Sequence, residues 1–338
     1  MRVVHVCCTD SFAGVERHVA DLATAQAVTG HEVTVVGGNP QRMQGAVGPG
    51  VLVRSGSTAA ESSRRLRETP VPDIVHVHMT AAEVAVALTV RLRNVPVVAT
   101  RHFAAPRGAR AWTRPVTRLA ARRIDAEIAV SRFVAAQVDG RSTVIHAGVP
   151  DQPDRLPSAQ RRRTVLLAQR LEPEKKTGLA LEAFAESGIC GRGWRLDVAG
   201  DGSLREELEA QARELGIASS TSFLGSRHDV DRLMRTCGVF LAPRGDEAYG
   251  LSVLEAMAAG APVVAAAGGG HLETAGNVSG AALFTVDDAD DAARKLAALV
   301  DDQTMRDNYG SALQQCQRTR FTLDRQVAET DAVYRSLV

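Results

Sequence analysis

The sequence has few of the features that mark several common classes of protein. Its five cysteines are an odd number without a C-x-x-C pair, which argues against a disulfide framework and against a zinc site. Its apolar runs are shorter than the roughly 20 residues that span a bilayer, and its first residues lead directly into a predicted strand, so we expect a cytoplasmic protein. Its net charge of +1 provides no overall field that would recruit nucleic acid.

The residues that are present predict an α/β enzyme with two domains. A length of 338 residues exceeds the limit of about 250 to 300 at which single cores stop growing. Strand-like and helix-like segments alternate throughout, which is typical of parallel sheets covered on both faces by helices. Residues 150–163, with three prolines and a run of three arginines, look like a linker. The expected strands are 3–7, 32–36, 74–77, 97–100, 127–130 and 143–145 in the first half, and 165–167, 195–198, 222–224, 239–242 and 263–266 in the second.

The most informative segment is 246–270, which places two carboxylates eight residues apart. Residues 251–259 read as a helix that follows the buried strand 239–242. Glu247 therefore lies in the loop before this helix, and Glu255 lies about 7 Å along its axis, at about 1.5 Å per residue. The helix N-terminus, whose N–H groups favour an anion, lies between the two acids.

An extended ligand with hydroxyl groups at both ends and a diphosphate in the middle would fit this arrangement. It would meet a carboxylate acceptor at each end and the positive end of a helix dipole at its centre. A nucleotide sugar has this shape. The alternative is an ordinary strand, loop and helix whose acids are solvated.

The spacing of Glu247 and Glu255 strongly resembles the Glu-x7-Glu signature of the family-4 retaining glycosyltransferases, whose fold is called GT-B. In that family the first Glu contacts the donor sugar and the second contacts the nucleotide ribose. The resemblance implies an α/β fold of two doubly wound, Rossmann-like domains that face each other across a cleft. It places an acceptor-binding domain at 1–152, a nucleotide-sugar-binding domain at 153–318, and a C-terminal helix at 319–338 that packs back on the first domain.

Residues 166–175 resemble the family's G-R-L-x-P-E-K segment, with Gln169 where a glycine is usual. A leaving nucleoside diphosphate gains negative charge, and fixed cations aimed at it stabilise that state. Arg170 and Lys175 are the candidate cations. Only three of the 40 basic residues are lysines, so the adjacent Lys175 and Lys176 indicate that this position favours a compact ammonium group over a guanidinium. A solvated turn is the alternative.

The loop at residues 9–17 joins the first predicted strand to the first predicted helix. The family typically has two glycines here, which let backbone N–H groups approach a phosphate, whereas this chain has Ala13 and Gly14. The resemblance therefore implicates Gly14 in donor binding and not Ala13. The G-x-G-x-x-G sequence of dehydrogenases is absent from this position.

Three histidines on or after the predicted strands 74–77 and 97–100 are candidates for the site. His102 matches the family's active-site histidine, which lies near the donor sugar. His76 and His78 alternate along one strand and so share a face. No third metal ligand is evident beside them, and a packing or acceptor-pocket role is favoured.

Two D-x-D sequences, at 229–231 and 288–290, match the metal-binding motif of sugar transferases of the other major fold. Each precedes or opens a predicted helix, where aspartates act as caps and partners of the helix dipole. With Arg170, Lys175 and a helix N-terminus available, the expected enzyme requires no metal and no other cofactor.

The segment 101–123 contains seven arginines and no acid. Four of them recur every four residues and form one basic stripe: Arg110, Arg114, Arg118 and Arg122. A solvated face is the favoured interpretation. Docking on an anionic membrane, as some members of the family do, and binding of an anionic acceptor are the alternatives.

By this resemblance the enzyme moves a sugar from a UDP-sugar, in preference to a GDP-sugar, to a small-molecule acceptor such as a thiol precursor or a secondary-metabolite core. Glu247 and His102 would orient the sugar, Arg170 and Lys175 would neutralise the diphosphate, and Glu255 would grip the ribose. The backbone of five consecutive residues would help to hold sugar and phosphate: Ala248, Tyr249, Gly250, Leu251 and Ser252. The alternatives are a catalytically silent nucleotide-sugar-binding protein, a membrane-associated lipid glycosyltransferase of the same fold, and a related phosphorylase or epimerase.

Overall fold

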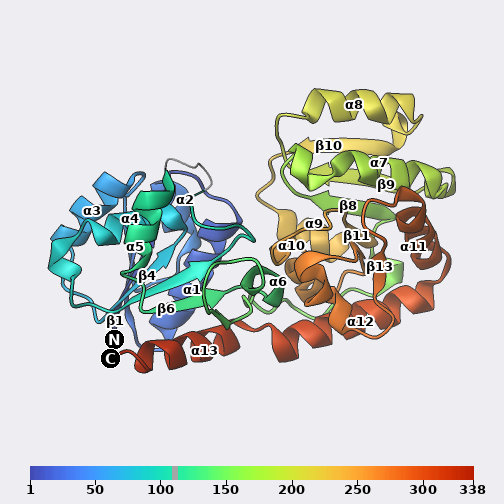
Figure 1. The fold of residues 1–338 in the computed structure, drawn as a ribbon. Coiled ribbons are helices and arrows are strands. Elements are labelled where there is room, and N and C mark those ends of the chain that lie inside the picture. The colour runs from blue at the N-terminus through green and yellow to red at the C-terminus, as the bar shows by residue number, and fades with distance from the viewer. Residues whose placement is uncertain (109–112) are drawn as a thin grey trace. The chain divides into compact units, whose positions relative to one another are not determined.

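The protein folds into two compact units in a computed structural model that describes residues 1–108 and 113–338 (Figure 1). The first unit comprises Met1–Pro150 together with Thr322–Val338, and the second comprises Asp151–Phe321. The predicted domain boundaries lie after residues 152 and 318, whereas the chain passes between the units after Pro150 and Phe321.

Parallel strands form the sheet of the first unit, in the order β3-β2-β1-β4-β5-β6-β7. The order reverses between β1 and β4, as it does in doubly wound folds. The strands are β1 (Arg2–Cys7), β2 (Glu32–Gly37), β3 (Val51–Arg54), β4 (Ile74–His78), β5 (Val97–Arg101), β6 (Ala126–Ala129) and β7 (Thr143–Val144). The helices are α1 (Gly14–Val28), α2 (Pro40–Ala46), α3 (Ala59–Glu68), α4 (Thr80–Ala87), α5 (Arg114–Ala121), α6 (Arg132–Ala135) and α13 (Leu323–Arg335).

The second unit repeats this plan with a sheet of order β10-β9-β8-β11-β12-β13, also parallel. The predicted α/β fold of two Rossmann-like units is therefore confirmed, although the short strands β3 and β13 were not predicted. The strands are β8 (Thr164–Ala168), β9 (Arg195–Ala199), β10 (Thr221–Gly225), β11 (Val239–Ala242), β12 (Val263–Ala266) and β13 (Ala282–Phe284). The helices are α7 (Thr177–Glu186), α8 (Arg205–Glu214), α9 (Val230–Thr236), α10 (Leu251–Ala258), α11 (Ala289–Asp301) and α12 (Gln303–Arg320).

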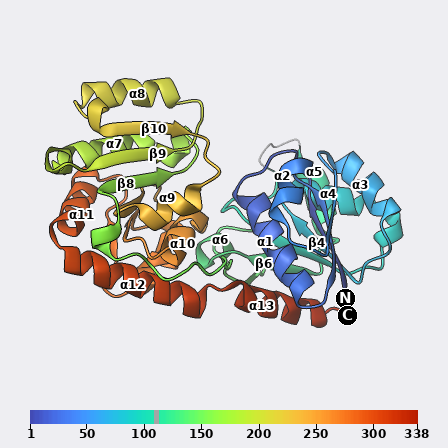
Figure 2. The same cartoon turned by 180° about the vertical axis from the view of Figure 1, so that it is seen from behind.

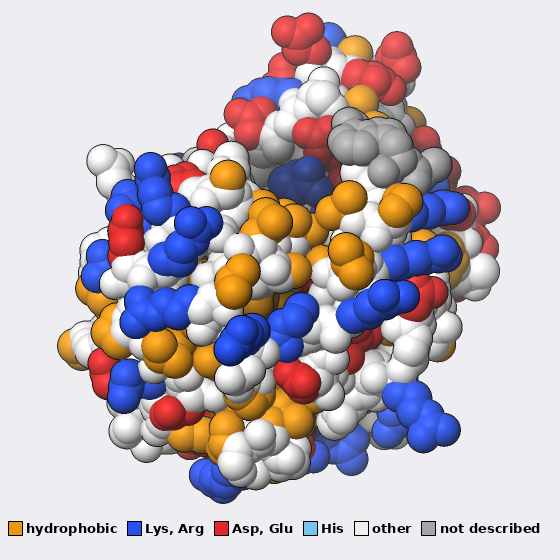
Figure 3. Space-filling view, turned by 60° about the vertical axis from the view of Figure 1, so that its left-hand side comes forward, with side chains coloured by type: hydrophobic (Ala, Val, Ile, Leu, Met, Phe, Trp, Pro, Cys, Tyr) orange, Lys and Arg blue, Asp and Glu red, His pale blue; other side chains and the backbone are white. Residues whose placement is uncertain are grey.

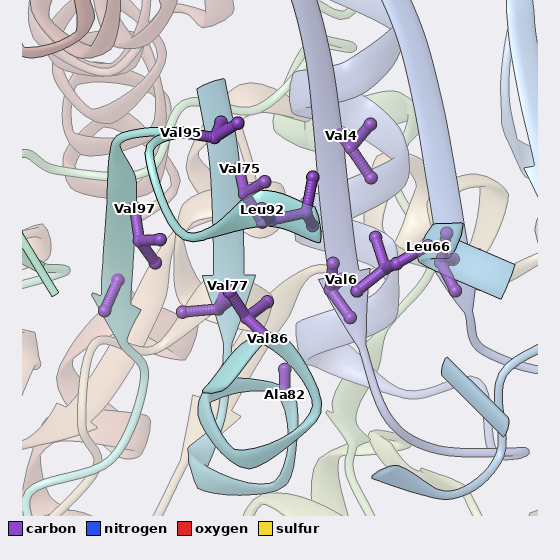
Figure 4. Packing of buried hydrophobic residues seen from close by; sticks show 12 residues of the cluster. Val4, Val6, Leu66, Val75, Val77, Ala82, Val86, Leu92, Val95 and Val97 are labelled. Carbon is purple, nitrogen blue, oxygen red and sulfur yellow. The ribbon is translucent and has the colours of Figure 1, made fainter. Parts of the chain in front are cut away.

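Both faces of the first sheet are buried, and the period of two along β1 divides its side chains between them. Val4 and Val6 pack on one face with Val75 and Val77 of β4 and with Leu66 of α3 (Figure 4). Val3, His5 and Cys7 point to the opposite face, which α1 and α13 cover. A buried histidine in the middle of β1 is thereby directed toward these two helices.

The helix α13 returns to the first unit and packs against α1 (Figure 2). Thr322 caps α13, because its hydroxyl accepts a hydrogen bond from the N–H of Arg325 at 3.2 Å. Gly148 has to be a glycine here, since a β-carbon at this position would lie 2.3 Å from the carbonyl oxygen of Thr322. The backbone N–H of Gly148 also donates to Gln326 at 2.8 Å, so the end of the first half of the chain is tied directly to α13.

The segment that was predicted to be a linker contains a buried arginine. The Arg161 guanidinium donates hydrogen bonds to five backbone carbonyls, at distances of 2.8 to 3.2 Å. Several of these carbonyls end α9 and α10, where the last turn of a helix lacks internal partners. Residues 150–163 are therefore not a free linker throughout, because Arg161 is part of the interior of the second unit. The accepting carbonyls belong to Leu156, Met234, Cys237, Ala259 and Gly260.

Candidate functional site

Two loops of the second unit touch at the position predicted for the donor. A β-carbon on Gly269 would lie 2.3 Å from the carbonyl oxygen of Glu247, and one on Gly270 would lie 2.3 Å from the α-carbon of Tyr249. The N–H of Gly270 donates to the same Glu247 carbonyl at 2.8 Å. The glycines after β12 are therefore required because they let this loop lie directly against the one that carries Glu247.

The structure brings together Glu247 and Lys175, the candidates from two separate motifs. The Lys175 ammonium lies 2.6 Å from a Glu247 carboxylate oxygen, and the two side chains are only 18% and 22% exposed. The Arg244 guanidinium lies 4.0 Å from the same oxygen. Burial is the largest influence on the pKa of Glu247 and would raise it, but the charge and the hydrogen bond of Lys175, together with the charge of Arg244, outweigh burial and hold this pKa below its usual value. Glu247 is therefore ionised at neutral pH.

Gln169 supports the loop that carries Lys175. Its side-chain amide donates to the Lys175 carbonyl at 3.0 Å and to the Thr177 hydroxyl at 2.9 Å. The residue after Lys175, Lys176, has a left-handed backbone with φ of 55°. The residue that departs from the family's usual glycine thus holds the turn that directs Lys175 toward Glu247.

The helix α10 begins between the two glutamates, as predicted. Gly250 precedes it with φ of 84°, and no side chain caps the helix at that position. The first turn of an α-helix leaves its N–H groups without partners inside the helix. Glu255 lies in the second turn and is half-buried. The backbone from Ala248 to Ser252 therefore connects an ionised carboxylate to a positive helix end.

Arg170 does not join this group. Its side chain is 60% exposed and pairs with Glu174 at 2.8 Å. Two residues that were not predicted lie at this site: the Arg244 guanidinium is 4.0 Å from a Glu247 carboxylate oxygen, and the His271 ring lies beside Gly250, 2.8 Å from where a β-carbon would be. His271 is buried, which lowers its own pKa and keeps it neutral. Both residues border the recognised motifs, Arg244 after β11 and His271 after the three glycines, and this adjacency was the available signal.

The helix α1 of the first unit begins at Gly14, which is exposed. The N–H of Ala13 donates to the carboxylate of Glu16 at 2.8 Å. This carboxylate therefore already occupies the position in which Ala13 could bind an anion. The role of Gly14 in donor binding stays a prediction.

A cluster of five histidines lies in the first unit, and the prediction that His76 and His78 lack a third neighbour is wrong. His5 pairs in register with His76 across β1 and β4. Two groups of three histidines, His5-His76-His78 and His18-His78-His102, have ligand nitrogens within 4.8 Å of one another. A metal ion would have to displace existing contacts, because both ring nitrogens of His5, His76 and His78 are already hydrogen-bonded.

Burial keeps these histidines neutral. It lowers the pKa of His5 and of His18 to about 4. Burial likewise places the pKa values of His76, His78 and His102 well below the usual range. Each neutral ring carries one proton, so it donates through one nitrogen and accepts through the other.

The arginines of segment 101–123 have two different environments. Arg107 is buried and pairs with Glu83 at 2.8 Å and also with Glu127, so it is not part of a solvated face. Arg101 is buried beside the same Glu127 at 3.6 Å. Glu83 and Glu127 lie on other elements of the fold, so the sequence of the segment itself gave no sign of these ion pairs.

The helix α5 exposes both apolar and basic side chains. Val116 is 56% exposed and Leu119 is 64% exposed, on the helix that carries Arg114 and Arg118. Hydrophobic and basic side chains lie side by side on the face that Figure 3 presents. Arg110, which belongs to the predicted basic stripe, lies outside the described residues.

The two D-x-D sequences lie at helix starts. Asp288 caps α11 and accepts a hydrogen bond from the N–H of Asp291 at 2.8 Å. Asp229 precedes α9, but its carboxylate pairs with Arg227 at 2.8 Å and with Arg232 at 3.1 Å. Within the described ranges, no helix combines the length and the apolar character that crossing a membrane requires.

Comparison with known proteins identifies the family. Residues 12–152 match the family described as Glycosyltransferase Family 4, and residues 149–315 match Glycosyl transferases group 1. The chain therefore belongs to these glycosyltransferases and has their GT-B fold.

Individual relatives are similar over different lengths. A phosphatidyl-myo-inositol mannosyltransferase of Mycolicibacterium smegmatis is 28% identical over 342 residues, 91% of this chain and 87% of that protein. A 2-deoxystreptamine glucosyltransferase of Streptomyces kanamyceticus is 33% identical over 135 residues, 39% of this chain and 35% of that enzyme. Alignments with curated relatives cover as little as 19% of the relative's length. The structure of Anabaena HepE in complex with UDP and glucose has a TM-score of 0.82 at 22% identity, over 99% of this chain and 100% of that one.

Proposed function

We propose that the protein is a retaining glycosyltransferase that moves a sugar from a nucleoside diphosphate sugar to a small-molecule acceptor without a metal ion. The observation that carries this proposal is the Lys175–Glu247 pair, 2.6 Å apart beside the start of α10. An anionic diphosphate is stabilised by a fixed ammonium together with a helix N-terminus.

Each donor group has a proposed role. Lys175 neutralises the diphosphate as its charge grows, and the N–H groups at the start of α10 bind its oxygens. Glu247 accepts hydrogen bonds from the sugar, for which an ionised carboxylate is suited. Glu255 binds the ribose. Arg170 could reach the diphosphate only by leaving Glu174, and its exposure of 60% permits that movement.

The donor nucleotide is proposed to be UDP in preference to GDP. Anabaena HepE, which has a similar fold, was solved with UDP and with UDP-glucose. The 2-deoxystreptamine glucosyltransferase supports a small acceptor, although it matches only part of this chain. His102 is proposed to orient the sugar by hydrogen bonding, since its ring is neutral.

The proposal is tested by measuring donor turnover with UDP-glucose and GDP-mannose, with and without candidate acceptors. Glu247→Ala and Glu255→Ala should each lower kcat/KM by more than tenfold, whereas Glu174→Ala, which changes an exposed acid of the neighbouring loop, should not. The anomeric configuration of the product, followed by NMR, tests retention. Donor binding without turnover in the unmodified protein would instead favour a catalytically silent nucleotide-sugar-binding protein.

A second candidate function is transfer to a lipid acceptor at a membrane surface. It is favoured by Val116 and Leu119, which are exposed among the arginines of α5. A helix with this composition binds anionic lipid through its apolar face and its charges together. If the unmodified protein sediments with phosphatidylglycerol vesicles and the Leu119→Asp variant does not, this candidate is supported. If the unmodified protein does not bind the vesicles, it is rejected.

A further inference from the structure

A chain of hydrogen bonds connects a buried glutamine to His102 through two other histidines. The Gln26 side-chain oxygen lies 2.7 Å from His5 Nε2, and His5 Nδ1 lies 3.0 Å from His78 Nε2. His78 Nδ1 in turn lies 3.0 Å from His102 Nε2. Gln26, His5 and His78 are fully buried, whereas His102 is partly exposed. The chain thus leads from fully buried residues of the first unit to His102, a residue that is only partly buried.

The direction of donation follows from counting protons. The carbonyl oxygen of Gln26 can only accept, so the proton of the neutral His5 ring is on Nε2. His5 Nδ1 then accepts from His78 Nε2–H, and His78 Nδ1 accepts from His102 Nε2–H. One proton per ring satisfies every bond, and the Nδ1 of His102 keeps its lone pair.

The neighbouring contacts agree with this orientation of Gln26. The Gln26 amide nitrogen donates to the Tyr334 hydroxyl at 3.4 Å. The Tyr334 hydroxyl can then donate to His76 Nδ1 at 2.5 Å, and His76 Nε2–H can donate to Thr100 at 2.6 Å. All hydrogen bonds of this second branch can therefore form without changing the protonation of any ring in the chain that leads to His102.

We propose that Gln26, His5 and His78 are positioning residues that fix His102 in the tautomer protonated on Nε2, so that its Nδ1 acts only as a hydrogen-bond acceptor. Such an acceptor selects a hydroxyl group as its partner and does not bind a carbonyl or a phosphate oxygen. The consequence for donor binding rests on the proposed function, in which His102 orients a sugar hydroxyl. The tautomer itself does not depend on that function.

The first test is two-bond ¹H–¹⁵N NMR of the full chain, in which the two ring nitrogens of each histidine show whether they carry a proton. Comparison with a His102→Gln variant assigns the His102 signals. We expect a protonated Nε2 and an unprotonated Nδ1 at pH 7.5. Protonation of His102 on Nδ1 in the unmodified protein overturns the proposal.

The second test breaks the chain at two separate points. Gln26→Met and His5→Leu each remove an acceptor that orders it, so His102 should lose its single tautomer in both. Donor kcat/KM should fall by roughly threefold to tenfold, the effect of one misdirected hydrogen bond. Thr100→Val is the matched control, since it removes a hydrogen bond to His76 within the same cluster but outside the chain. It should leave the tautomer of His102 unchanged.

The outcomes separate the two proposals. If the His102 signals are the same in Gln26→Met, in His5→Leu and in the unmodified protein, the chain does not set the tautomer and the inference is wrong. If the tautomer is as expected but His102→Gln turns over donor normally, the inference holds and the proposed role of His102 in catalysis fails.

Discussion

The Lys175–Glu247 pair should stabilise the second unit far more than the ion pair in the adjoining loop. Its side chains are 18% and 22% exposed, whereas those of Arg170 and Glu174 are 60% and 41% exposed. A hydrogen bond between charged groups contributes about 1.5 to 3 kcal/mol when largely removed from water, and an exposed pair contributes about 0.5 kcal/mol. We therefore expect a coupling energy of about 2 kcal/mol for Lys175–Glu247.

The assay is a double-mutant cycle of Lys175→Met and Glu247→Gln, with Arg170→Met and Glu174→Gln as the matched control cycle. Unfolding in urea can be followed by the fluorescence of Trp194, which is buried in the same unit. In a unit of about 170 residues, each kcal/mol shifts the melting temperature by about 2 to 4 °C. Each substitution in the first cycle should thus lower it by several degrees.

The pH dependence provides an independent check on the same pair. Because the folded protein holds the pKa of Glu247 below its ordinary value of 4.5, the stabilisation is complete above that pH and is lost as the pH falls through the lowered pKa. The difference between Glu247→Gln and the unmodified protein should shrink in the same range. Equal coupling energies in the two cycles, or a difference that persists unchanged at pH 3, would refute the reasoning.

Three further results are expected. Gly269→Ala should destabilise the second unit by about 1 to 3 kcal/mol and abolish donor turnover, because its β-carbon would meet a carbonyl at 2.3 Å; Gly191→Ala, with open space around it, should change neither. Arg161→Met should lower the free energy of unfolding in urea by about 3 to 5 kcal/mol, because it leaves buried carbonyls unpaired, while the exposed Arg162→Met should have little effect. The pKa of His5 is about 4 when folded against an ordinary 6.5. As the pH falls from 6.5 to 4, the free energy of unfolding should therefore fall by about 1.4 kcal/mol per pH unit for each such histidine. An acid titration followed by circular dichroism that shows no loss of structure would contradict this.

Local patterns in the sequence were sufficient to predict most of the fold and the meeting of two motifs at the candidate site. Most of the strands are rich in apolar residues, and the motif around Glu247 contains its own loop, helix start and glycines. The strand β3 was missed because only its first residue, Val51, is buried. The strand β13 was missed because it is only three residues long.

Contacts between distant segments could not be predicted in the same way. The histidine cluster depends on the register of β1 against β4, which aligns His5 with His76, and no local pattern encodes this register. Arg161 was misread because its run of three arginines resembles a solvated segment, although only the first of them is buried. The side chain of Arg170 was assigned from its motif, but its rotamer pairs it with Glu174.

The return of α13 to the first unit has a consequence for synthesis of the protein. Tyr334 supplies the hydroxyl that faces His76, yet it leaves the ribosome only after all of the second unit has been made. Until then this face of the first sheet is covered by α1 alone, and its polar network lacks the Tyr334 hydroxyl. The interior of the first unit is therefore completed when α13 leaves the exit tunnel, and not when the first 150 residues have been made.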